Sequence, residues 1–536
     1  MARRPLIWWL GALLLLSPFG TRGDEPRPAP SPVRADVVLK GGLVVDGTGA
    51  PGKRADVAIL GERIVAVGSF KVVPGAKVID ASRWVVAPGF IDLHTHSDTA
   101  ILQPKTRPNL NYQAQGVTTI VTGNCGSGPI DVGGFLKEVD KQGAGTNVIH
   151  LIPHGSLRQS VLGNAQVKAT PEALATMASK VDQAMRQGAW GMSTGLIYVP
   201  GMYADTAELV SLAKVVGKRG GIYASHMRDE GTALLDSIDE TLTIGREAKL
   251  PVHISHLKAS GKAAWGLAGK ALERIEAARA KGQRVTADQY PYIASSTRLA
   301  AMVVPHWARQ GNADEFRRIA DDPVRGAKLR AEISKELEQR SGGASVRIAR
   351  YARAPGRVGK NLVEIAAAEQ TTPLEVVLDI ERNGGAQAIS FGMDEAEVRQ
   401  IMTHDYVATA SDGGADVPGG PDKPHPRVYG TFPRKIRYAL DDKVITLEQA
   451  VRSSSGLPAE ILHLRDRGVI REGAYADLVV FDPKTFRDAA TFDDSTRYAP
   501  GVAYLFVNGV AAIAEGKPRR VLPGRALRLT TDGPSS

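Results

Sequence analysis

The 536-residue chain has very little cysteine and few aromatic side chains. Cys125 is its only cysteine, so no intrachain disulfide can form. Aromatic residues make up 6% of the chain, which argues against a ligand surface built from stacked rings. Glycine (57 residues) and proline (32 residues) supply many turns without making the sequence low in complexity. With 43% hydrophobic and 23% charged residues, the composition excludes a wholly disordered chain.

A concentrated charge of one sign is also missing. The formal net charge is +10, from 67 basic and 57 acidic residues, but the excess is spread along the sequence. The densest basic clusters, Arg317-Arg318 and Arg519-Arg520, are each only a pair. Because the sequence has no basic stripe, aromatic RNA-binding motif or helix-turn-helix pattern, we expect no nucleic-acid partner.

Only the N-terminus carries a long apolar run. Two arginines precede the apolar stretch 6–16, and small residues up to Gly23 follow, which is the pattern of a secretory signal over residues 1–23. The run is shorter than the ~20 residues that a membrane span needs, which favours cleavage over an uncleaved anchor. The proline-rich residues 24–35 are expected to form a disordered leader. We therefore expect an exported protein, periplasmic or secreted, with no stable membrane insertion after cleavage.

Short runs rich in valine and isoleucine occur at both ends of the remaining chain. Residues 36–87 contain VVLKGGLVVDGTG and DVAILGERIVAVG, and the same texture returns later in ADLVVFDP and VAYLFVNG. Such runs, separated by glycine and aspartate, predict β-strands. Because the two segments flank a middle of different character, we expect one small β-sandwich domain built from residues 36–87 and 460–530.

The middle of the chain, residues 88–459, alternates strand-like and helical patterns. Helix signals lie between the strands, for example Thr170 as N-cap before Pro171 at the first helical position. Strand ends recur at intervals of roughly 30 residues, the length of a βα unit, and this repetition predicts a (β/α)8 barrel. A doubly wound open sheet alternates in the same way, so periodicity alone leaves both open. The strand-like runs are 89–94, 117–123, 147–153, 189–194, 221–226, 251–256, 284–289 and 406–412.

One interval is too long for a single connection between a barrel strand and the next helix. Residues 290–405 contain a charged amphipathic stretch at 314–340, a turn-rich segment and a helical pattern at 373–382. We interpret the part around 295–385 as an insertion over one face of the barrel. The run 387–393 is a further strand candidate, which leaves the numbering of the last two barrel strands ambiguous.

Polar residues with metal-binding chemistry lie at several of these strand ends. His94 and His96 end the first strand in FIDLHTHSD, and residues two apart on a strand point to the same side. His226, His256 and Asp412 end later strands in the same way. Since active sites of (β/α)8 barrels lie at the carboxyl ends of the strands, these five groups are expected to meet at one mouth.

Cys125 follows the second strand, in the glycine-rich segment TIVTGNCGSG. A free cysteine is most often a buried, inert thiol, and a nucleophile paired with a histidine is another option. Zinc, however, prefers histidine and cysteine ligands, and a bound metal would protect the thiol from oxidation after export. His253, three residues before His256, is expected to face away from the mouth and to have a supporting or structural role.

Through the motifs around these residues, the chain resembles the amidohydrolase superfamily. It is most similar to the N-acyl-D-amino-acid deacylase (D-aminoacylase) family, roughly over residues 36–520. Many members of the superfamily bridge two metals with a carboxylated lysine on the fourth strand, but here that strand reads GAWGMSTGL and has no lysine. The family that the chain resembles uses a cysteine ligand instead, which fits Cys125. The motifs are GFIDLHTHSD, GNCGSG, GLIYVPGMYA, ASHMRDEG, HISHLK, ADQYPY, SDGG, HPRVYGTFPR and GVIREGAYADLVVFDP.

The resemblance implies one tightly bound zinc ion and a second, weaker metal position that the cysteine can bridge. It also implies Asp412 as general base and acid, and a pocket for the substrate carboxylate. The implied ligands of the tight ion are Cys125, His226 and His256, and those of the weaker position are His94 and His96. The implied substrate-binding residues are Tyr198, Lys258, Tyr290, Ser296 and Arg427.

The implied reaction is hydrolysis of the linear amide of an N-acyl-D-amino acid to a carboxylate and a free D-amino acid. Zinc lowers the pKa of its bound water to about 7, so hydroxide is available at neutral pH. Asp412 would take the proton and deliver it to the leaving amine. The preference for the D form rests on the resemblance alone. Arg298, two residues beyond Ser296, is interpreted as an exposed loop charge, so a neutral amino-acid side chain is expected.

Two other functions stay open at this stage. A cyclic-amide or other C–N hydrolase would use the same scaffold, although Cys125 and the motif HPRVYGTF favour the deacylase. An exported metal-binding protein without catalytic activity is the third possibility. Asp412 argues against it, because a pure binding site needs no proton shuttle.

The exported protein is predicted to begin just after Gly23, because the apolar run ends in a small-residue cleavage pattern. N-terminal sequencing of protein recovered from the periplasm or the medium measures this start directly. A recovered chain that still begins at Met1 would indicate an uncleaved anchor instead.

Overall fold

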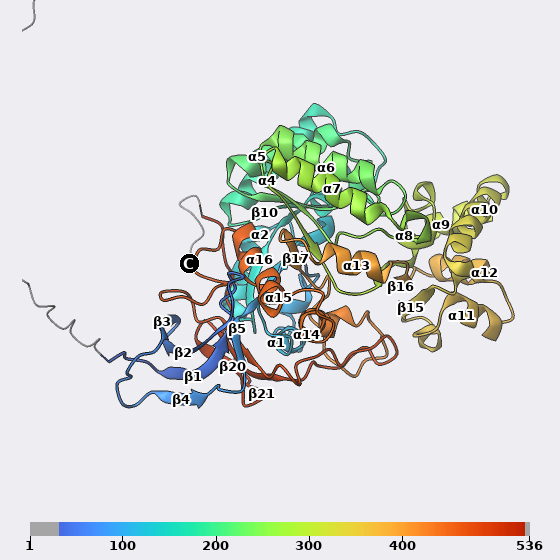
Figure 1. Cartoon of the computed structure of the whole chain (residues 1–536). Helices are drawn as coiled ribbons and strands as arrows, with labels where there is room; N and C mark the ends of the chain where they lie inside the picture. Colours follow the sequence, from blue (N-terminus) through green and yellow to red (C-terminus); the bar gives the residue numbers. More distant parts are fainter. Residues whose placement is uncertain (1–31, 531–536) are drawn as a thin grey trace, which may run out of the picture.

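Each strand-like run of the middle segment forms a strand in the computed structural model, which describes residues 32–530 (Figure 1). The expected secretion signal, residues 1–23, lies outside the described residues. The run 147–153 is interrupted at Leu151, so β8 and β9 together occupy one strand position. The barrel strands are β6 (Phe90–Asp92), β7 (Val117–Thr122), β8 (Asn147–His150), β9 (Ile152–Pro153), β10 (Gly191–Gly195), β11 (Ile222–His226), β12 (Val252–Ile254), β13 (Val285–Gln289) and β17 (Val407–Thr409).

Backbone hydrogen bonds between the ends of β6 and β17 close these parallel strands into a barrel. The Asp412 N–H donates to the His94 carbonyl over 2.9 Å, and the His96 N–H donates to the Gly413 carbonyl over 2.6 Å. Thr95 and Gly413 form a parallel bridge at the same place. The fold is therefore a (β/α)8 barrel, as predicted, and the open-sheet alternative is excluded.

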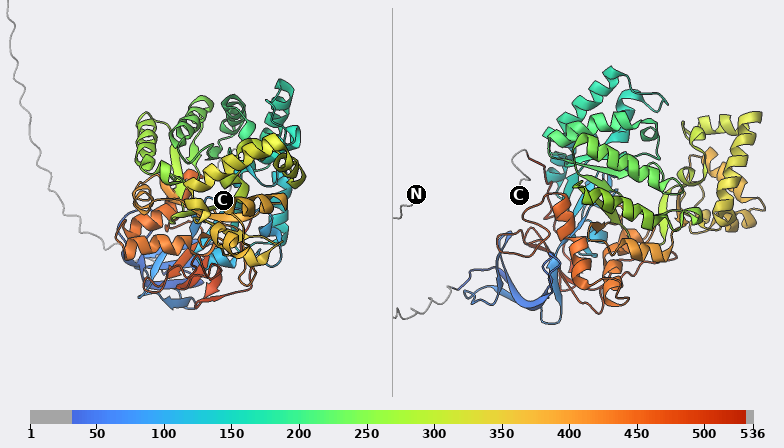
Figure 2. Two further views of the ribbon diagram at one scale, coloured as in Figure 1. Left: turned by 90° about the vertical axis from the view of Figure 1, so that its right-hand side faces the viewer. Right: turned by 45° about the horizontal axis from the view of Figure 1, so that its top comes forward.

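Helices connect the strands and cover the outside of the barrel, with α4 to α7 packed side by side (Figures 1 and 2). Helix α4 begins as the sequence predicts, because the Thr170 hydroxyl accepts the Ala173 N–H and Pro171 lies in the first turn. The connecting helices are α1 (Leu110–Gln113), α2 (Val132–Gln142), α3 (His154–Leu162), α4 (Pro171–Arg186), α5 (Thr206–Lys218), α6 (Leu234–Ala248), α7 (Leu267–Ala280), α13 (Glu395–Ile401), α14 (Arg427–Leu440), α15 (Leu447–Ser454) and α16 (Gly456–Ile461).

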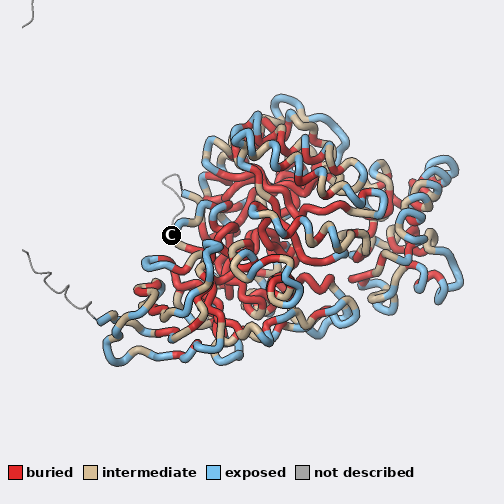
Figure 3. The backbone as a smooth tube through the Cα atoms, viewed as in Figure 1, coloured by how far each residue is buried: buried red, intermediate tan, exposed pale blue. Residues whose placement is uncertain are grey.

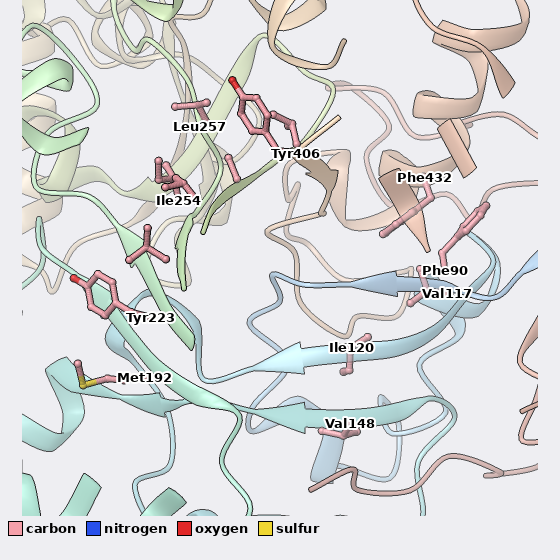
Figure 4. Close-up of a cluster of buried hydrophobic side chains, with 14 of the residues drawn as sticks. Phe90, Val117, Ile120, Val148, Met192, Tyr223, Ile254, Leu257, Tyr406 and Phe432 are labelled. Atoms are coloured by element: carbon pink, nitrogen blue, oxygen red, sulfur yellow. The ribbon is translucent and has the colours of Figure 1, made fainter. Parts of the chain in front are cut away.

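The barrel strands lie in the buried centre of the molecule (Figure 3). Residues on their two faces belong to two different apolar clusters. Val148 packs under the helices and Ile149 packs inside the barrel, and Tyr223 and Ala224 divide in the same way. His226, two residues beyond Ala224, continues the inward set. Figure 4 shows part of the helix-covered cluster, with Phe90, Val117, Ile120, Val148, Met192, Tyr223, Ile254, Leu257, Tyr406 and Phe432 labelled.

The two ends of the chain form one nine-stranded sheet, in the order β21-β20-β19-β18-β5-β1-β2-β3 with β4 paired to β1. Antiparallel pairing of β5 with β18 joins the N-terminal and C-terminal halves. Leu39 and Leu478, one from each half, belong to the same buried cluster. The strands are β1 (Val37–Val44), β2 (Lys53–Leu60), β3 (Arg63–Gly68), β4 (Lys77–Asp80), β5 (Val85–Pro88), β18 (Leu478–Phe481), β19 (Val502–Val507), β20 (Val510–Ala514) and β21 (Lys517–Pro518).

The limits of this β-domain differ from the expected ones at both ends. Val33 lies in the segment expected to be a disordered leader, but it forms a parallel bridge with Val72. Residues 524–529 leave the sheet and pack on the floor of the barrel, where the Trp190 indole N–H donates to the Leu527 carbonyl over 3.0 Å. Both segments are held by apolar contacts, since Val33 and Leu527 each pack into a cluster.

The long interval between β13 and β17 forms a lobe with its own apolar cluster, at the right of Figure 1. Its antiparallel sheet has the order β14-β16-β15, so the run 387–393 belongs to the lobe and not to the barrel. The amphipathic stretch 314–340 is divided at Asp322, whose carboxylate caps α10. The elements are β14 (Ala294–Arg298), α8 (Leu299–Val303), α9 (Ala313–Asp321), α10 (Pro323–Gln339), β15 (Val346–Arg350), α11 (Leu362–Ala368), α12 (Pro373–Arg382) and β16 (Gln387–Phe391).

Lys435 of α14 is a buried cation for which the described part of the chain supplies no acidic partner. Its Nζ donates only to the Met402 carbonyl, over 3.4 Å, and burial lowers its pKa from 10.5 to about 7. The ammonium form is therefore more favourable in the unfolded chain than in the folded one. Across the described residues, no helix is both long and apolar enough to cross a bilayer.

Replacing Lys435 with methionine is predicted to stabilise the protein in a pH-dependent way. Burying the charged lysine reduces the free energy of unfolding. This reduction is absent above pH 10.5, grows as the pH falls, and reaches its full size below about pH 7. The reduction in the free energy of unfolding is at most roughly 5 kcal/mol. The melting temperature of Lys435→Met should thus exceed that of the wild type more at pH 6 than at pH 10. The exposed Lys281→Met is the control, and an equal gain at both pH values would contradict the assignment.

Candidate metal centre and active site

Side chains from five strand ends converge at the carboxyl-terminal mouth of the barrel. They come from distant parts of the sequence and meet because the parallel register aligns the strand ends. All five residues predicted to bind metal take part, together with the predicted general base. His94 and His96 follow β6, Cys125 follows β7, His226 ends β11, His256 follows β12 and Asp412 follows β17.

The Cys125 sulfur lies at the centre of the cluster. Its distance is 3.2 Å to His94 Nε2, 3.5 Å to His226 Nδ1 and 3.7 Å to His256 Nε2. Zinc bonds of roughly 2.0–2.3 Å in a tetrahedron place neighbouring donors about 3.5 Å apart. The sulfur and the imidazole nitrogens therefore have both the chemistry and the spacing to hold one zinc ion.

Three of these residues have left-handed backbone conformations, which side chains other than glycine rarely adopt. The φ angles are 51° at Cys125, 37° at His256 and 49° at Asp412. The Cys125 loop also needs Gly195 opposite it, because a Cβ at that position would overlap the Cys125 carbonyl oxygen. Such conformations cost about 1–3 kcal/mol each and gather at functional sites, where the surrounding structure imposes them.

The mouth stabilises negative charge on the cysteine. Burial opposes ionisation of Cys125, but the charges of His94 and His226 outweigh it and hold the thiol pKa well below its ordinary value. In the same way burial opposes protonation of His94, yet Cys125 and Asp412 raise its pKa well above the usual range. A thiolate among imidazoles is the form in which cysteine binds a metal.

Asp412 lies between the metal donors and a buried arginine. Its Oδ1 is 3.0 Å from His96 Nε2 and 3.5 Å from His94 Nε2, and its Oδ2 is 2.9 Å from Arg427 Nη2. Burial favours the neutral acid, but Arg427 and His94 hold the carboxyl pKa well below its ordinary value. Asp412 is therefore an ionised carboxylate that can accept a proton at the mouth.

A cleft of about 660 Å³ leads outward from Asp412 and Cys125. Arg427 presents Nε and Nη1, and Tyr290 its hydroxyl, without hydrogen-bond partners in the described part of the chain, although all three atoms are buried. Such groups are suited to an anionic ligand. All the residues predicted to bind substrate line this cleft: Tyr198, Lys258, Tyr290, Ser296 and Arg427.

The lobe supplies one wall of the cleft. Tyr198 is hydrogen-bonded through its hydroxyl to Thr297 Oγ1 over 2.8 Å, and the Ser296 hydroxyl donates to the Ala388 carbonyl over 2.9 Å. Arg298 is exposed, as expected. It does not lie in a loop, however, because it is the last residue of β14 and lines the cleft. Arg309 lines the same wall, and burial lowers its pKa to about 10. This wall therefore carries positive charge.

Two carboxylates behind the metal donors were missed from the sequence. Asp288 accepts His253 Nε2–H over 2.8 Å and the His256 N–H over 2.6 Å, and its Oδ2 is 3.5 Å from His94 Nδ1. His253 thus bonds to a residue next to the cluster without joining it. Asp288 lies near the carboxyl end of β13. The position of polar residues at strand ends, which predicted the histidines, would therefore also have predicted Asp288. Glu230 lies in a loop, where no such rule applies.

Comparison with known proteins places the chain among hydrolases of this architecture. The profile of the amidohydrolase family matches residues 77–513. D-aminoacylase of Alcaligenes xylosoxydans xylosoxydans is 36% identical over 92% of this chain and 98% of its own length. N-acyl-D-glutamate deacylase of the same organism is 35% identical over 92% of this chain and 97% of its own length.

Solved structures agree with the sequence relatives. A crystal structure of D-aminoacylase has a TM-score of 0.79 and 35% identity, covering 92% of this chain and all of that one. N-acyl-D-glutamate deacylase from Bordetella bronchiseptica, complexed with zinc and a phosphonate mimic of the tetrahedral intermediate, has a TM-score of 0.80 and 32% identity over 92% of this chain and all of that one. The resemblance predicted from the motifs is confirmed: the chain belongs to the amidohydrolase family, in its D-aminoacylase branch.

Proposed function

We propose that the protein is a zinc-dependent hydrolase that cleaves the amide bond of N-acyl-D-amino acids to a carboxylate and a free D-amino acid. The observation that carries this proposal is the convergence of Cys125 with three histidines, beside an ionised Asp412. Relatives at 35–36% identity act on N-acylated D-amino acids, which supports the substrate class. The D configuration rests on those relatives.

Cys125, His226 and His256 would hold the tight zinc ion, as in the family that the motifs indicate, and each imidazole presents one nitrogen to the Cys125 sulfur, at 3.5 Å and 3.7 Å. His94 and His96 would face a second, weaker position. A related D-aminoacylase has a binuclear metal centre with one-metal activation and second-metal attenuation, which supports unequal roles for two positions. When bound, zinc is a Lewis acid that lowers the pKa of water and polarises a carbonyl.

Asp412 would move the proton during the reaction. Its Oδ1 faces the metal donors, so it can accept the proton of the attacking water there. It can then deliver that proton to the amide nitrogen, which must be protonated because an amide anion is too basic to leave. Arg427 keeps the carboxylate ionised between turnovers through its contact with Oδ2.

The substrate carboxylate would bind where the cleft presents unpaired donors. Arg427 offers Nε and Nη1, Tyr290 offers its hydroxyl, and Lys258 Nζ lies 5.7 Å from the Tyr290 ring centroid. Each of these donors can make a charge-assisted hydrogen bond to a carboxylate oxygen. Fixing the carboxylate, the scissile carbonyl and the side chain at three separate points selects one configuration at the α-carbon.

Two variants are predicted to separate metal binding from proton transfer. Asp412→Asn should retain zinc but lose at least about a hundredfold in kcat, because the amide cannot accept the proton. Cys125→Ala should lose both zinc and activity while the fold is largely retained. Metal analysis, turnover of N-acetyl-D-methionine and circular dichroism measure the three properties.

The wild type with chelated metal is the control for Cys125→Ala, and the two should have similarly low activity. Near-wild-type turnover by Asp412→Asn would overturn the assigned proton transfer. Stoichiometric zinc in Cys125→Ala, held as tightly as in the wild type, would overturn the cysteine ligand.

The preferred amino-acid side chain distinguishes two candidate substrates. A neutral side chain is the expectation from the sequence, whereas Arg298 and Arg309 in the cleft wall favour an acidic one. N-acyl-D-glutamate and N-acyl-D-aspartate deacylases are each 35% identical to the chain, close to the 36% of D-aminoacylase, so identity does not decide between them.

Because Arg298 is exposed and water screens its charge, we predict that N-acetyl-D-methionine has a higher kcat/KM than N-acetyl-D-glutamate, and that Arg298→Met changes this ratio less than threefold. The measurement is a panel of N-acetyl-D- and L-amino acids with a hydantoin as cyclic-amide control. A strong preference for the glutamate or aspartate substrate, lost tenfold or more in Arg298→Met, would assign the acidic substrate instead.

A further inference from the structure

Glu230 has no role in the mechanism above, yet it lies directly behind the metal donors. It belongs to the loop after β11, four residues beyond His226, and 12% of its side chain is exposed. Its loop is fixed by hydrogen bonds, because the Glu230 carbonyl accepts the Ser260 N–H over 2.7 Å and the Asp229 carboxylate accepts the Gly231 N–H over 2.7 Å. The Glu230 carboxylate is therefore held in a defined place.

His256 requires an acceptor for its second ring nitrogen. Its Nε2 faces the Cys125 sulfur, so as a zinc ligand it carries its proton on Nδ1. Nδ1 lies 2.8 Å from Glu230 Oε1 and 2.9 Å from Lys258 Nζ. Because an ammonium has no lone pair, only the Glu230 oxygen can accept this proton. Glu230 thus fixes both the tautomer and the orientation of His256.

The same carboxylate oxygen holds Lys258. Lys258 Nζ donates to Glu230 Oε1 over 2.6 Å and to the His256 carbonyl over 2.9 Å, while its side chain is buried and lines the cleft. Two hydrogen-bond acceptors fix the ammonium beside Tyr290. Glu230 is therefore shared between a metal donor and a group that faces the substrate pocket.

The other oxygen of Glu230 faces a second metal donor. His226 Nδ1 points to the Cys125 sulfur, and His226 Nε2 lies 3.9 Å from Glu230 Oε2 and has no hydrogen-bond partner in the described part of the chain. One carboxylate thus lies behind two of the three donors assigned to the tight ion. Its negative charge also offsets the Lys258 ammonium, which would otherwise repel a cation at the cluster.

We propose that Glu230 is a positioning residue that orients His256 for zinc and holds Lys258 for the substrate carboxylate. The second half of this inference rests on the proposed function, whereas the first half concerns metal affinity alone. Carboxylates behind zinc-bound histidines fix the ring and the tautomer, and their loss weakens metal binding by about 10–100-fold. Glu230 would therefore connect metal affinity and substrate affinity through one side chain.

The test uses the full chain and measures zinc affinity by competition with a chelator, together with kcat and KM for N-acetyl-D-methionine at saturating zinc. Glu230→Gln is expected to raise the zinc Kd about 10–100-fold, and to raise KM several-fold while kcat stays within about threefold of the wild type. Lys258→Met keeps the carboxylate and should raise KM while the zinc Kd stays within threefold. Glu240→Gln is the matched control, because Glu240 pairs with Arg228 and Thr206 outside the cleft, and should change neither quantity.

A folded Glu230→Gln whose zinc Kd lies within threefold of the wild type would overturn the proposal. If Glu230→Gln does not fold, Lys258→Met decides, because a tenfold loss of zinc affinity in that variant would contradict the assignment of Glu230 as the support of His256. Absence of turnover on every N-acyl-D-amino acid by the wild type would refute the proposed function, and the zinc measurement would still decide the role of Glu230.

Discussion

Closure of the barrel between its first and last strands is the constraint on which the site depends. The Asp412 N–H donates to the His94 carbonyl and the His96 N–H donates to the Gly413 carbonyl, so the backbone as well as the side chains fixes Asp412 and the first two histidines. His96 and Asp412 are 316 residues apart in sequence, yet their side chains are 3.0 Å apart. Without these two hydrogen bonds, Asp412 would move away from His94 and His96 even if every side chain stayed the same.

The three parts of the molecule meet behind Arg427. His425 accepts the Arg427 N–H at Nδ1 and donates from Nε2 to the Ala294 carbonyl of the lobe, over 2.9 Å. Phe492, from the connection between β18 and β19 of the β-domain, packs against the His425 ring with centroids 5.0 Å apart. The barrel supplies Arg427, the lobe supplies the facing wall, and the β-domain supports the ring between them. Arg427 is therefore held by contacts from all three parts, which lowers the entropy cost of binding a charged group at this position.

The barrel and its donors were predictable because they follow rules that are local in sequence. Alternating strands and helices fix the strand ends, and a histidine at such an end must lie at the mouth. The lobe was less predictable. Its strands β14 and β16 are far apart in the sequence, so no local pattern predicts that they pair. Asp322 also divides a continuous amphipathic pattern into α9 and α10. Glu230 could not be found, because its role depends on a loop conformation that the Ser260 hydrogen bond determines. Val33 was missed for a similar reason, since its partner Val72 lies in another segment.

The charges at the mouth explain what the carboxylates behind the donors can contribute. The Cys125 thiolate and Asp412 stabilise positive charge on His94 and raise the pKa of its imidazole. Zinc competes with protons for imidazole nitrogens, because a nitrogen must present a lone pair to bind it. A carboxylate that accepts the proton on the far nitrogen selects that form before the ion arrives. Glu230 faces His256 in this way at 2.8 Å, while Asp288 lies 3.5 Å from the far nitrogen of His94 and adds its negative charge behind that ring.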